Sequence, residues 1–191
     1  NCDKWKIACG KCPKKTEYPI SFFFDGSRRN FRMKRKWFTD IPNLTILAPS
    51  EWIKDIVKES FLKGRRIEVV HNGIELKVFY PQNDESVWKK YNIPSDRKIL
   101  LGVANIWDKR KGLDDFLLIA RILPDEYHIV LVGLTKRQMK KLPGDITGIE
   151  RTSDITELVK IYSGASIFIN PSLEESFSLV TVEAMACGTP A

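Results

Sequence analysis

The chain has 191 residues, of which 43% are hydrophobic and 29% charged, a composition typical of a globular protein with one large domain or parts of two. No apolar run approaches the roughly 18 residues of a membrane-spanning helix, and no signal peptide is visible. The net charge of +7 is uneven, because residues 1–80 carry 17 Lys and Arg against 9 Asp and Glu, whereas residues 81–191 carry 14 against 15. This asymmetry predicts two bodies with different partners.

The first body is expected to be a short α/β unit. Its stretch SRRNFRMKRKWF predicts an amphipathic basic helix, and two short apolar runs predict buried strands. Ser50 is a good N-cap for a helix between those strands. The elements expected here, in chain order, are an irregular segment at residues 1–20, the basic helix within 21–39, a strand at 44–48, a helix after Ser50 and a strand at 67–70.

A polar linker with prolines separates this body from a second one, in which strand and helix patterns alternate. Such alternation predicts an α/β fold with a parallel sheet and right-handed crossovers. The elements expected here are strands at residues 98–105, 128–132, 148–151 and 166–170, the last covered on both faces, and helices at 113–123, 136–142, from 154, and from near 178.

Three of the four cysteines lie near the start of the chain, where Cys9 and Cys12 form a C-x2-C pair with Cys2 upstream. The spacing suits zinc, but structural zinc sites usually have four ligands and no histidine lies nearby. We favour free thiols or a partial site over an intact zinc site, whose fourth ligand would lie upstream. A disulfide between Cys9 and Cys12 is the remaining alternative. Cys187 is expected to be a small buried residue.

Two carboxylates mark the end of the chain, where Glu175 and Glu183 lie on either side of an expected strand-to-helix junction. Glu183 falls on the apolar stripe of the helix, where a carboxylate is costly to bury without hydrogen-bond donors. Glu175 precedes the helix N-terminus, whose free N–H groups and dipole attract anions. An anion cradle between two acceptors of hydroxyl hydrogen bonds fits a sugar nucleotide, which has a diphosphate between two polyols.

The segment PSLEESFSLVTVEAMACGTP resembles the E-x7-E signature of retaining glycosyltransferases of family 4, of the bacterial polysaccharide-biosynthesis type. It departs from the usual pattern at Ser176, where Gly is common. The resemblance implies an α/β fold of the GT-B type, with a Rossmann-like parallel sheet flanked by helices and an incomplete second domain. It divides the chain into the end of an N-terminal acceptor-side domain (1–80), an interdomain linker (81–97) and a truncated donor-binding domain (98–191).

A basic loop, NIWDKRKG at residues 105–112, follows the strand at 98–105. Ligands of open α/β sheets bind outside the carboxyl ends of strands, so this loop is expected to line the same cleft as Glu175. Family 4 enzymes commonly have an Arg six residues before a Lys-Gly pair, and Lys111 aligns with that Lys. Asn105 stands where the Arg is expected. We therefore expect Arg110 to substitute as a phosphate ligand, with Arg110→Ala as damaging as Lys111→Ala.

The resemblance also implies a mechanism in which a nucleoside diphosphate leaves the transferred sugar. Glu183 would accept hydrogen bonds from ribose hydroxyls and Glu175 from sugar hydroxyls. No metal site and no cofactor are expected, since the nucleotide-sugar is the substrate and the family does not need a catalytic divalent metal. The expected catalytic residues are Arg110, Lys111 and Glu175, and the expected donor-binding residues are Asn105, Phe177, Ser178, Leu179 and Glu183.

The expected activity is transfer of a sugar from a nucleotide-sugar to a glycan or lipid-linked acceptor with retention of configuration, and the isolated fragment is expected to be inactive.

The basic stretch at 27–38 is interpreted first as an ordinary surface helix, then as a contact with an anionic membrane, and last as a nucleic-acid site. A non-catalytic basic-surface binding protein on a GT-B scaffold is the alternative function. No nucleic-acid partner is expected, and the expected location is the cytoplasm, at the inner face of the cytoplasmic membrane. A dinucleotide-binding protein has little support because no G-x-G-x-x-G follows a strand.

Overall fold

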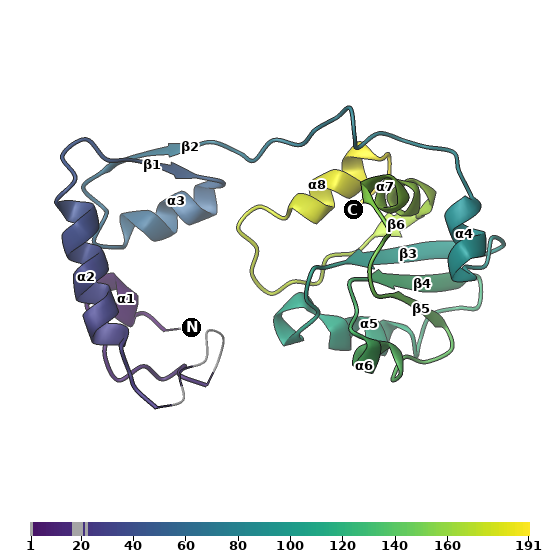
Figure 1. The fold of residues 1–191 in the computed structure, drawn as a ribbon, viewed down its shortest axis with the longest axis horizontal. Helices are drawn as coiled ribbons and strands as arrows, with labels where there is room; N and C mark the ends of the chain where they lie inside the picture. The colour runs from purple at the N-terminus through teal and green to yellow at the C-terminus, as the bar shows by residue number, and fades with distance from the viewer. Residues whose placement is uncertain (1, 17–20, 22) are drawn as a thin grey trace. The chain divides into compact units, whose positions relative to one another are not determined.

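The computed structural model describes residues 2–16, 21 and 23–191. It divides into two compact units, Asn1–Asn72 and Gly73–Ala191, and each contains parallel strands with helices (Figure 1). The division after Asn72 precedes the boundary that the sequence led us to expect at residue 80. The expected linker 81–97 contains helix α4 (Ser86–Tyr91), whose Val87 and Trp88 are buried in the core of the second unit. Apolar burial therefore makes this segment part of that unit.

Unit 1 is built around a two-stranded parallel sheet of β1 (Thr45–Ala48) and β2 (Arg66–Val69). Helix α3 (Glu51–Lys58) connects the strands and contacts both. Its start is fixed by Ser50, whose side chain accepts a hydrogen bond from the N–H of Ile53 at 3.3 Å, as the sequence predicted.

The basic helix α2 (Ser27–Thr39) covers the stretch that the sequence predicted to be helical, and Asp25 just before it accepts a hydrogen bond from the N–H of Ser27 at 3.0 Å. Its one buried residue is Phe31, which packs edge-on against Phe61. A short helix α1 (Lys4–Ile7) lies within the segment predicted to be irregular, of which residues 1 and 17–20 are outside the described residues.

Unit 2 contains a four-stranded parallel sheet in the order β5-β4-β3-β6 (Figure 1). Leu100 of the central strand β3 lies opposite Ile129 on one side and Ile167 on the other. The strands are β3 (Lys98–Val103), β4 (Tyr127–Val132), β5 (Ile146–Ile149) and β6 (Ile167–Phe168). The helices besides α4 are α5 (Leu113–Ile119), α6 (Lys136–Met139), α7 (Ile155–Gly164) and α8 (Leu179–Ala186), with a 3-10 turn η1 (Lys109–Lys111).

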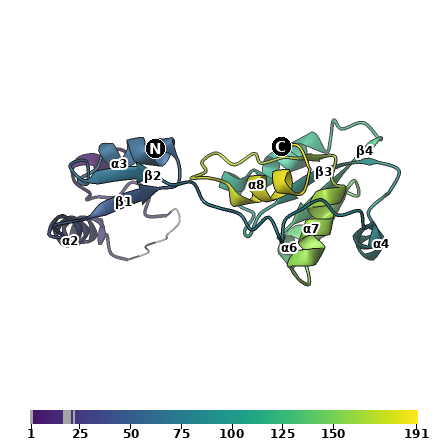
Figure 2. The ribbon, with the colours of Figure 1, turned by 90° about the horizontal axis from the view of Figure 1, so that it is seen from above.

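Alternate side chains of the strands feed two hydrophobic clusters, one on each face of this sheet. Ile99 and Leu101 of β3 join the cluster that includes residues of α4, α7 and α8, and Leu100 joins the cluster that includes Phe116 of α5. Figures 1 and 2 both show α8 beside α7, in agreement with the contacts between these helices. The predicted α/β fold with a parallel sheet is confirmed.

Strand β6 is shorter and less covered than predicted. Only Ile167 and Phe168 have strand geometry, instead of residues 166–170, and Ile167 is 39% exposed. The strand pairs with β3 on one side, and on the other the N–H of Phe168 donates a hydrogen bond to the carbonyl of Pro190 at 2.7 Å. A position near the sheet edge explains the shorter ladder and the partial cover.

Candidate functional site

Two loops meet at the carboxyl end of the sheet in unit 2, one after β3 and one after β6. Gly112 lies directly against Pro171 of the other loop, because a Cβ atom on Gly112 would be 2.5 Å from Cγ of Pro171. Gly112 also has φ +73°, a conformation that side chains disfavour. The N–H of Leu173 donates a hydrogen bond to the carbonyl of Arg110 at 2.9 Å. The Gly of the predicted Lys-Gly pair is therefore required both by backbone conformation and by space.

The loop after β3 is fixed by hydrogen bonds to neighbouring elements and by a cap within the loop itself. Trp107 is buried, and its Nε1–H donates to the carbonyl of Val132 at 2.8 Å. Gln138 donates through Nε2 to the carbonyl of Trp107 at 2.8 Å. Asp108 caps η1, since its Oδ1 accepts from the N–H groups of Arg110 and Lys111 at 2.9 and 3.1 Å. These bonds fix the backbone that carries the cations.

Lys111 forms an ion pair with Glu175 across the two loops. The side chains are 34% and 26% exposed, so the pair is partly shielded from water. Burial raises the pKa of Glu175, but the bonds from the Lys111 ammonium and from Ser172 outweigh it and lower the pKa overall. Glu175 is therefore ionised near neutral pH. The structure thus brings together two of the three residues predicted to be catalytic.

Arg110 is placed differently from Lys111. Its guanidinium binds Asp108, with Nη2 at 3.0 Å and Nε at 3.2 Å from Oδ2, and its side chain is 67% exposed. The sequence led us to treat the two cations alike, but Arg110 forms this pair within its own loop. Asn105, at the start of the same loop, is exposed.

The start of helix α8 is shaped by Ser178, which has φ 60° in the left-handed region. Its hydroxyl lies 2.7 Å from Nδ2 of Asn170 and 2.7 Å from Oγ1 of Thr181, which hold this conformation in place. Among the described non-glycine residues, positive φ occurs at Lys11, Asn92 and Ser178. Ser176 therefore does not need the freedom of the Gly that is common at its position.

The N-terminus of α8 points its first N–H groups ahead of the helix. The first helical bond is donated by the N–H of Thr181 to the carbonyl of Ser178 at 3.2 Å, so the N–H groups of Leu179 and Val180 precede it. Phe177 and Ser178 are partly buried here, and Leu179 is 45% exposed. These N–H groups, together with the positive end of the helix dipole, are suited to bind an anion.

Glu183 lies in the middle of α8 and faces α7, where the Tyr162 hydroxyl donates to Oε2 of Glu183 at 2.9 Å. Burial raises the pKa of Glu183, and the hydrogen bond from Tyr162 partly opposes that rise. A carboxylate on an apolar stripe was expected to need such a donor, and Tyr162 is that donor. Sequence reasoning did not identify Tyr162 as the partner of Glu183, because the pairing joins two different helices.

The cysteines of unit 1 are not joined in disulfides: Cys2, Cys9 and Cys12 are free and partly buried, and Cys187 in unit 2 is free and buried as predicted. The part of the chain that the structure describes contains no group of three or more His, Cys, Asp or Glu side chains arranged to hold a metal ion. The alternative of a disulfide between Cys9 and Cys12 is therefore wrong for this structure.

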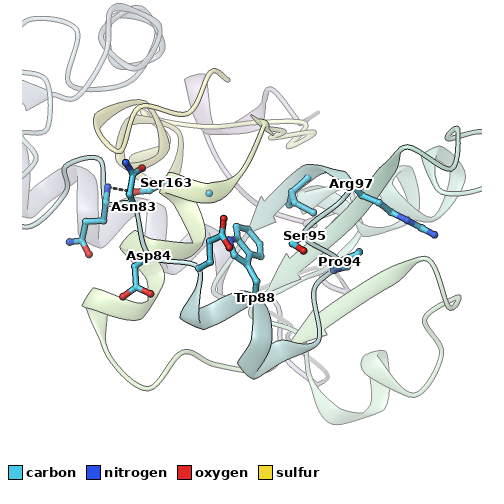
Figure 3. Close-up of a pocket in the computed structure, with 11 residues that line it drawn as sticks. Asn83, Asp84, Trp88, Pro94, Ser95, Arg97 and Ser163 are labelled. Atoms are coloured by element: carbon cyan, nitrogen blue, oxygen red, sulfur yellow. Dashed lines mark hydrogen bonds between the residues drawn. The ribbon is translucent and has the colours of Figure 1, made fainter.

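A pocket of about 390 Å³ lies at the opposite, amino-terminal end of the sheet (Figure 3). Trp88 lies among its lining residues and packs on Gly164, where a Cβ atom would be 2.0 Å from the Trp ring. Ser163 accepts a hydrogen bond from the N–H of Gln82 at 3.1 Å. These contacts dock the segment around α4 on α7. The pocket lies far along the strands from the carboxyl-end loops, so we assign the candidate site to those loops.

This geometry agrees with comparisons to known proteins. Residues 97–191 match the family described as Glycosyl transferases group 1. That segment contains both carboxyl-end loops, helix α8 and all the predicted site residues. The predicted resemblance to glycosyltransferases is confirmed at this level, whereas family 4 and retention of configuration stay predictions.

Curated relatives and solved structures point the same way. A D-inositol 3-phosphate glycosyltransferase of Mycolicibacterium gilvum is 34% identical over 137 residues, which cover 65% of this chain and 30% of the relative. A processive diacylglycerol alpha-glucosyltransferase of Acholeplasma laidlawii is 25% identical over 155 residues, covering 76% and 46%. The chain therefore spans between about a third and a half of these relatives.

The fold is that of GT-B glycosyltransferases. Sucrose-phosphate synthase from Thermosynechococcus elongatus superposes with a TM-score of 0.68 at 24% identity, covering 94% of this chain and 47% of that one. Anabaena HepE in complex with UDP and glucose gives a TM-score of 0.63 at 18% identity, covering 85% and 47%. At these identities the likeness establishes the architecture, and the chemistry must be argued from the side chains.

Proposed function

We propose that unit 2 of this chain is the donor-binding part of a glycosyltransferase that takes a sugar from a nucleoside diphosphate sugar and retains its anomeric configuration. The observation that carries the proposal is the Lys111–Glu175 ion pair, whose Glu175 lies in the loop that leads into α8, together with Glu183 in the middle of that helix. Cation, helix dipole and two carboxylates are the groups that a diphosphate between two polyols requires. Relatives that transfer sugars, and a similar fold bound to UDP and glucose, support this choice.

The reaction breaks the bond between the anomeric carbon and a phosphate oxygen, and the diphosphate leaves with the electron pair. The oxygen of an acceptor hydroxyl forms the new bond to the anomeric carbon, and the proton of that hydroxyl passes to the leaving diphosphate. Lys111 and the N–H groups at the start of α8 stabilise the charge that grows on that oxygen. The ammonium is already present in the ion pair with Glu175, so it moves little to meet the phosphate. Because those groups are fixed by the Gly112 contact and the Asp108 cap, little reorganisation is needed during the reaction.

The two carboxylates orient the polyols on either side of the diphosphate. Glu175 accepts hydrogen bonds from hydroxyls of the transferred sugar, and Glu183 from hydroxyls of the ribose. We propose no catalytic metal, since Lys111 and the helix N-terminus supply the positive charge. The acceptor is a glycan or a lipid-linked glycan, and retention rests on the likeness of the tail segment to the E-x7-E signature. The similarity of residues 97–191 to glycosyltransferases favours this function over a non-catalytic scaffold.

Calorimetric titration of the full-length protein with UDP, GDP and ADP tests the proposal. One nucleotide should bind best, and Glu183→Ala should weaken its binding about tenfold or more, as loss of a hydrogen-bonded charge does. The matched control is Glu174→Ala, which removes an exposed carboxylate from the neighbouring loop. Folded protein that binds none of the three nucleotides would contradict the proposal.

A second partner is proposed for helix α2 of unit 1, namely an anionic membrane at the cytoplasmic face. All six of its cations are exposed, and Trp37 and Phe38 at its end are 58% and 42% exposed. Cations attract anionic headgroups, and aromatic rings insert at the interface. The cations are Arg28, Arg29, Arg32, Lys34, Arg35 and Lys36. None of the helices formed by the described residues has the length and apolarity needed to cross a bilayer.

Vesicle cosedimentation separates this partner from the other readings of α2. Full-length protein should bind vesicles with phosphatidylglycerol and not vesicles of phosphatidylcholine alone, and Arg29→Ala with Arg32→Ala should reduce binding by roughly 1 kcal/mol per cation. Binding to an oligonucleotide without binding to anionic vesicles would favour a nucleic-acid site instead. Binding to neither would leave α2 as an ordinary surface helix.

A further inference from the structure

Tyr162 is the most deeply buried polar side chain next to a proposed donor-binding residue. It lies on α7 with 0% exposure, and its ring packs against Phe168 at a centroid distance of 6.0 Å. Its backbone carbonyl accepts a hydrogen bond from the hydroxyl of Thr189, beyond the end of α8. The ring and the backbone are thus both fixed, so the direction of the hydroxyl group is determined by the packing of α7 on α8.

The Tyr162 hydroxyl donates to Oε2 of Glu183 at 2.9 Å. Burial, together with the neighbouring carboxylate, raises the pKa of Tyr162 well above its usual range, so the phenol keeps its proton and acts as the donor. This is the only hydrogen bond that the described residues give to the Glu183 carboxylate. Oε2 is therefore engaged by the protein, and Oε1 is the oxygen that a hydroxyl of a ligand can approach.

The Glu183 carboxylate depends on this hydrogen bond because its surroundings are apolar. Its neighbours Ala184 on α8 and Cys187, directly after that helix, are buried in the hydrophobic cluster, and burial raises the pKa of Glu183. Without a donor, the carboxylate would take up a proton at higher pH or turn toward water. A protonated carboxyl group has lost part of its capacity to accept hydrogen bonds, and a rotated one is misplaced.

We propose that Tyr162 is a positioning residue for nucleotide recognition: its hydroxyl holds Glu183 in the orientation in which the carboxylate accepts hydrogen bonds from the ribose. The inference rests on the proposed function, because it deepens the role given there to Glu183. The simpler reading is that the bond only satisfies a buried phenol. The two readings differ in one respect: a positioning residue affects recognition of the ribose hydroxyls, and a structural residue does not.

Tyr162→Phe in the full-length protein tests this inference, since it removes the hydroxyl and keeps the buried ring. Calorimetry would compare UDP, GDP and ADP with their 2′-deoxy and 3′-deoxy forms between roughly pH 5.5 and 8.5. Wild-type protein should bind the ribonucleotide more tightly than one deoxy form. In Tyr162→Phe, affinity for the ribonucleotide should fall about tenfold, and the preference for the ribonucleotide over the deoxy form should shrink. As the solution is acidified, binding to the variant should begin to weaken at a higher pH than binding to the wild-type protein.

Two controls isolate the effect. Tyr91→Phe removes another phenol, which interacts with Glu157 and packs against the same hydrophobic cluster near α4, and it should leave nucleotide affinity and its pH profile unchanged. Tyr162→Phe in a Glu183→Gln background should cost less than a further twofold, because the carboxylate it positions is gone. Cooperative thermal unfolding of each variant confirms that the ring packing is retained.

Each outcome has a separate meaning. If Tyr162→Phe weakens ribo- and deoxynucleotides equally with no change in the pH profile, or weakens neither, the positioning role is overturned while the proposed function stands. If wild-type protein binds none of the nucleotides, the proposed function fails and this inference fails with it. If Glu183→Ala weakens binding and Tyr162→Phe reduces the discrimination of ribose, both are supported.

Discussion

The two carboxylates of the candidate site are held in opposite ways. Glu175 lies in the loop after β6, faces the Lys111 ammonium, and has a lowered pKa. Glu183 lies within α8, faces the neutral phenol of Tyr162, and has a raised pKa. We call these the loop side and the helix side. The loop side carries the charge that can meet a leaving diphosphate, and the helix side carries a fixed acceptor for hydroxyls.

The difference follows from what each side must do. An ammonium paired with a carboxylate can shift its bond toward a phosphate without a large movement. A buried carboxylate with one oxygen held by a phenol can distinguish hydroxyl donors by position, because a hydrogen bond to a charged group is strong and directional. Reactivity is therefore expected to depend mainly on the loop side and nucleoside recognition on the helix side.

Lys111→Ala should break the loop side and have the largest effect. Loss of a preorganised charge next to the leaving group typically costs about 3–4 kcal/mol, so turnover should fall roughly 100- to 1000-fold. Steady-state kinetics of the full-length protein measure this. Lys109→Ala, which removes an exposed cation from the same 3-10 turn, is the matched control and should cost less than about tenfold.

Gly112→Ala should damage the loop side through the backbone. The new Cβ atom would clash with Pro171, and the alanine would have to adopt the unfavourable φ of +73°. We therefore expect a loss of about 2–4 kcal/mol in the free energy of unfolding and a fall in turnover. Denaturant unfolding measures the first effect. Gly144→Ala is the control, because no atom lies within 4 Å of the added methyl group. Equal stability of the two variants would show that the contact between the loops is not needed.

Glu157→Gln tests a third carboxylate, which is buried but is not part of the proposed site, for comparison with Glu175 and Glu183. Burial raises the pKa of Glu157, but hydrogen bonds from Lys90 and Ser153 outweigh it and lower the pKa from 4.5 to about 2. Its contribution to stability is therefore present above about pH 4.5 and is lost as the pH falls toward 2. Glu157→Gln should cost about 1–3 kcal/mol at pH 7, and the gap should close in acid.

The readout for Glu157→Gln is urea unfolding at several pH values, beside nucleotide binding at pH 7. Nucleotide affinity should stay within about twofold of wild type, since the Glu157 carboxylate bonds to Lys90 and Ser153, which are not among the proposed donor-binding residues. A gap in stability that stays constant down to pH 3 would mean that the charge of Glu157 does not stabilise the fold.

Arg110→Ala should have the smallest effect, about tenfold or less in kcat/KM. The sequence predicted an effect as large as that of Lys111→Ala, but the guanidinium is bound to Asp108 and largely exposed. An exposed pair contributes little by itself, so a large loss would have to come from contact with the leaving diphosphate. Kinetics with both single variants decide this, and equal losses would restore the earlier expectation.

The comparison also shows what the sequence could predict. Lys111, Gly112 and Glu175 follow strands that pair in parallel, so their position at one end of the sheet follows from the order of the elements. The Ser50 cap was predicted because capping depends on residues near each other in sequence. In both cases the structure depends on local pattern and the rules of parallel sheets.

The features that the sequence did not predict depend on contacts between distant segments. The Tyr162–Glu183 bond joins two helices, and the same helical spacing would suit a tyrosine that only packs in the core. Helix α4 lies in a segment rich in polar residues and became part of unit 2 through Trp88 packed on Gly164. The pair of Arg110 with Asp108 depends on the fold of the 3-10 turn.

The most direct test of the division between loop side and helix side is calorimetry with three ligands, UDP, UMP and uridine. Each ligand is titrated into wild-type protein, Lys111→Ala and Glu183→Gln. If GDP or ADP binds best, the corresponding guanine or adenine ligands are used instead. We expect Lys111→Ala to lose the preference for the diphosphate over the monophosphate and to bind the nucleoside unchanged. Glu183→Gln should weaken all three ligands by a similar factor. If both variants weakened all three ligands alike, the division would be wrong.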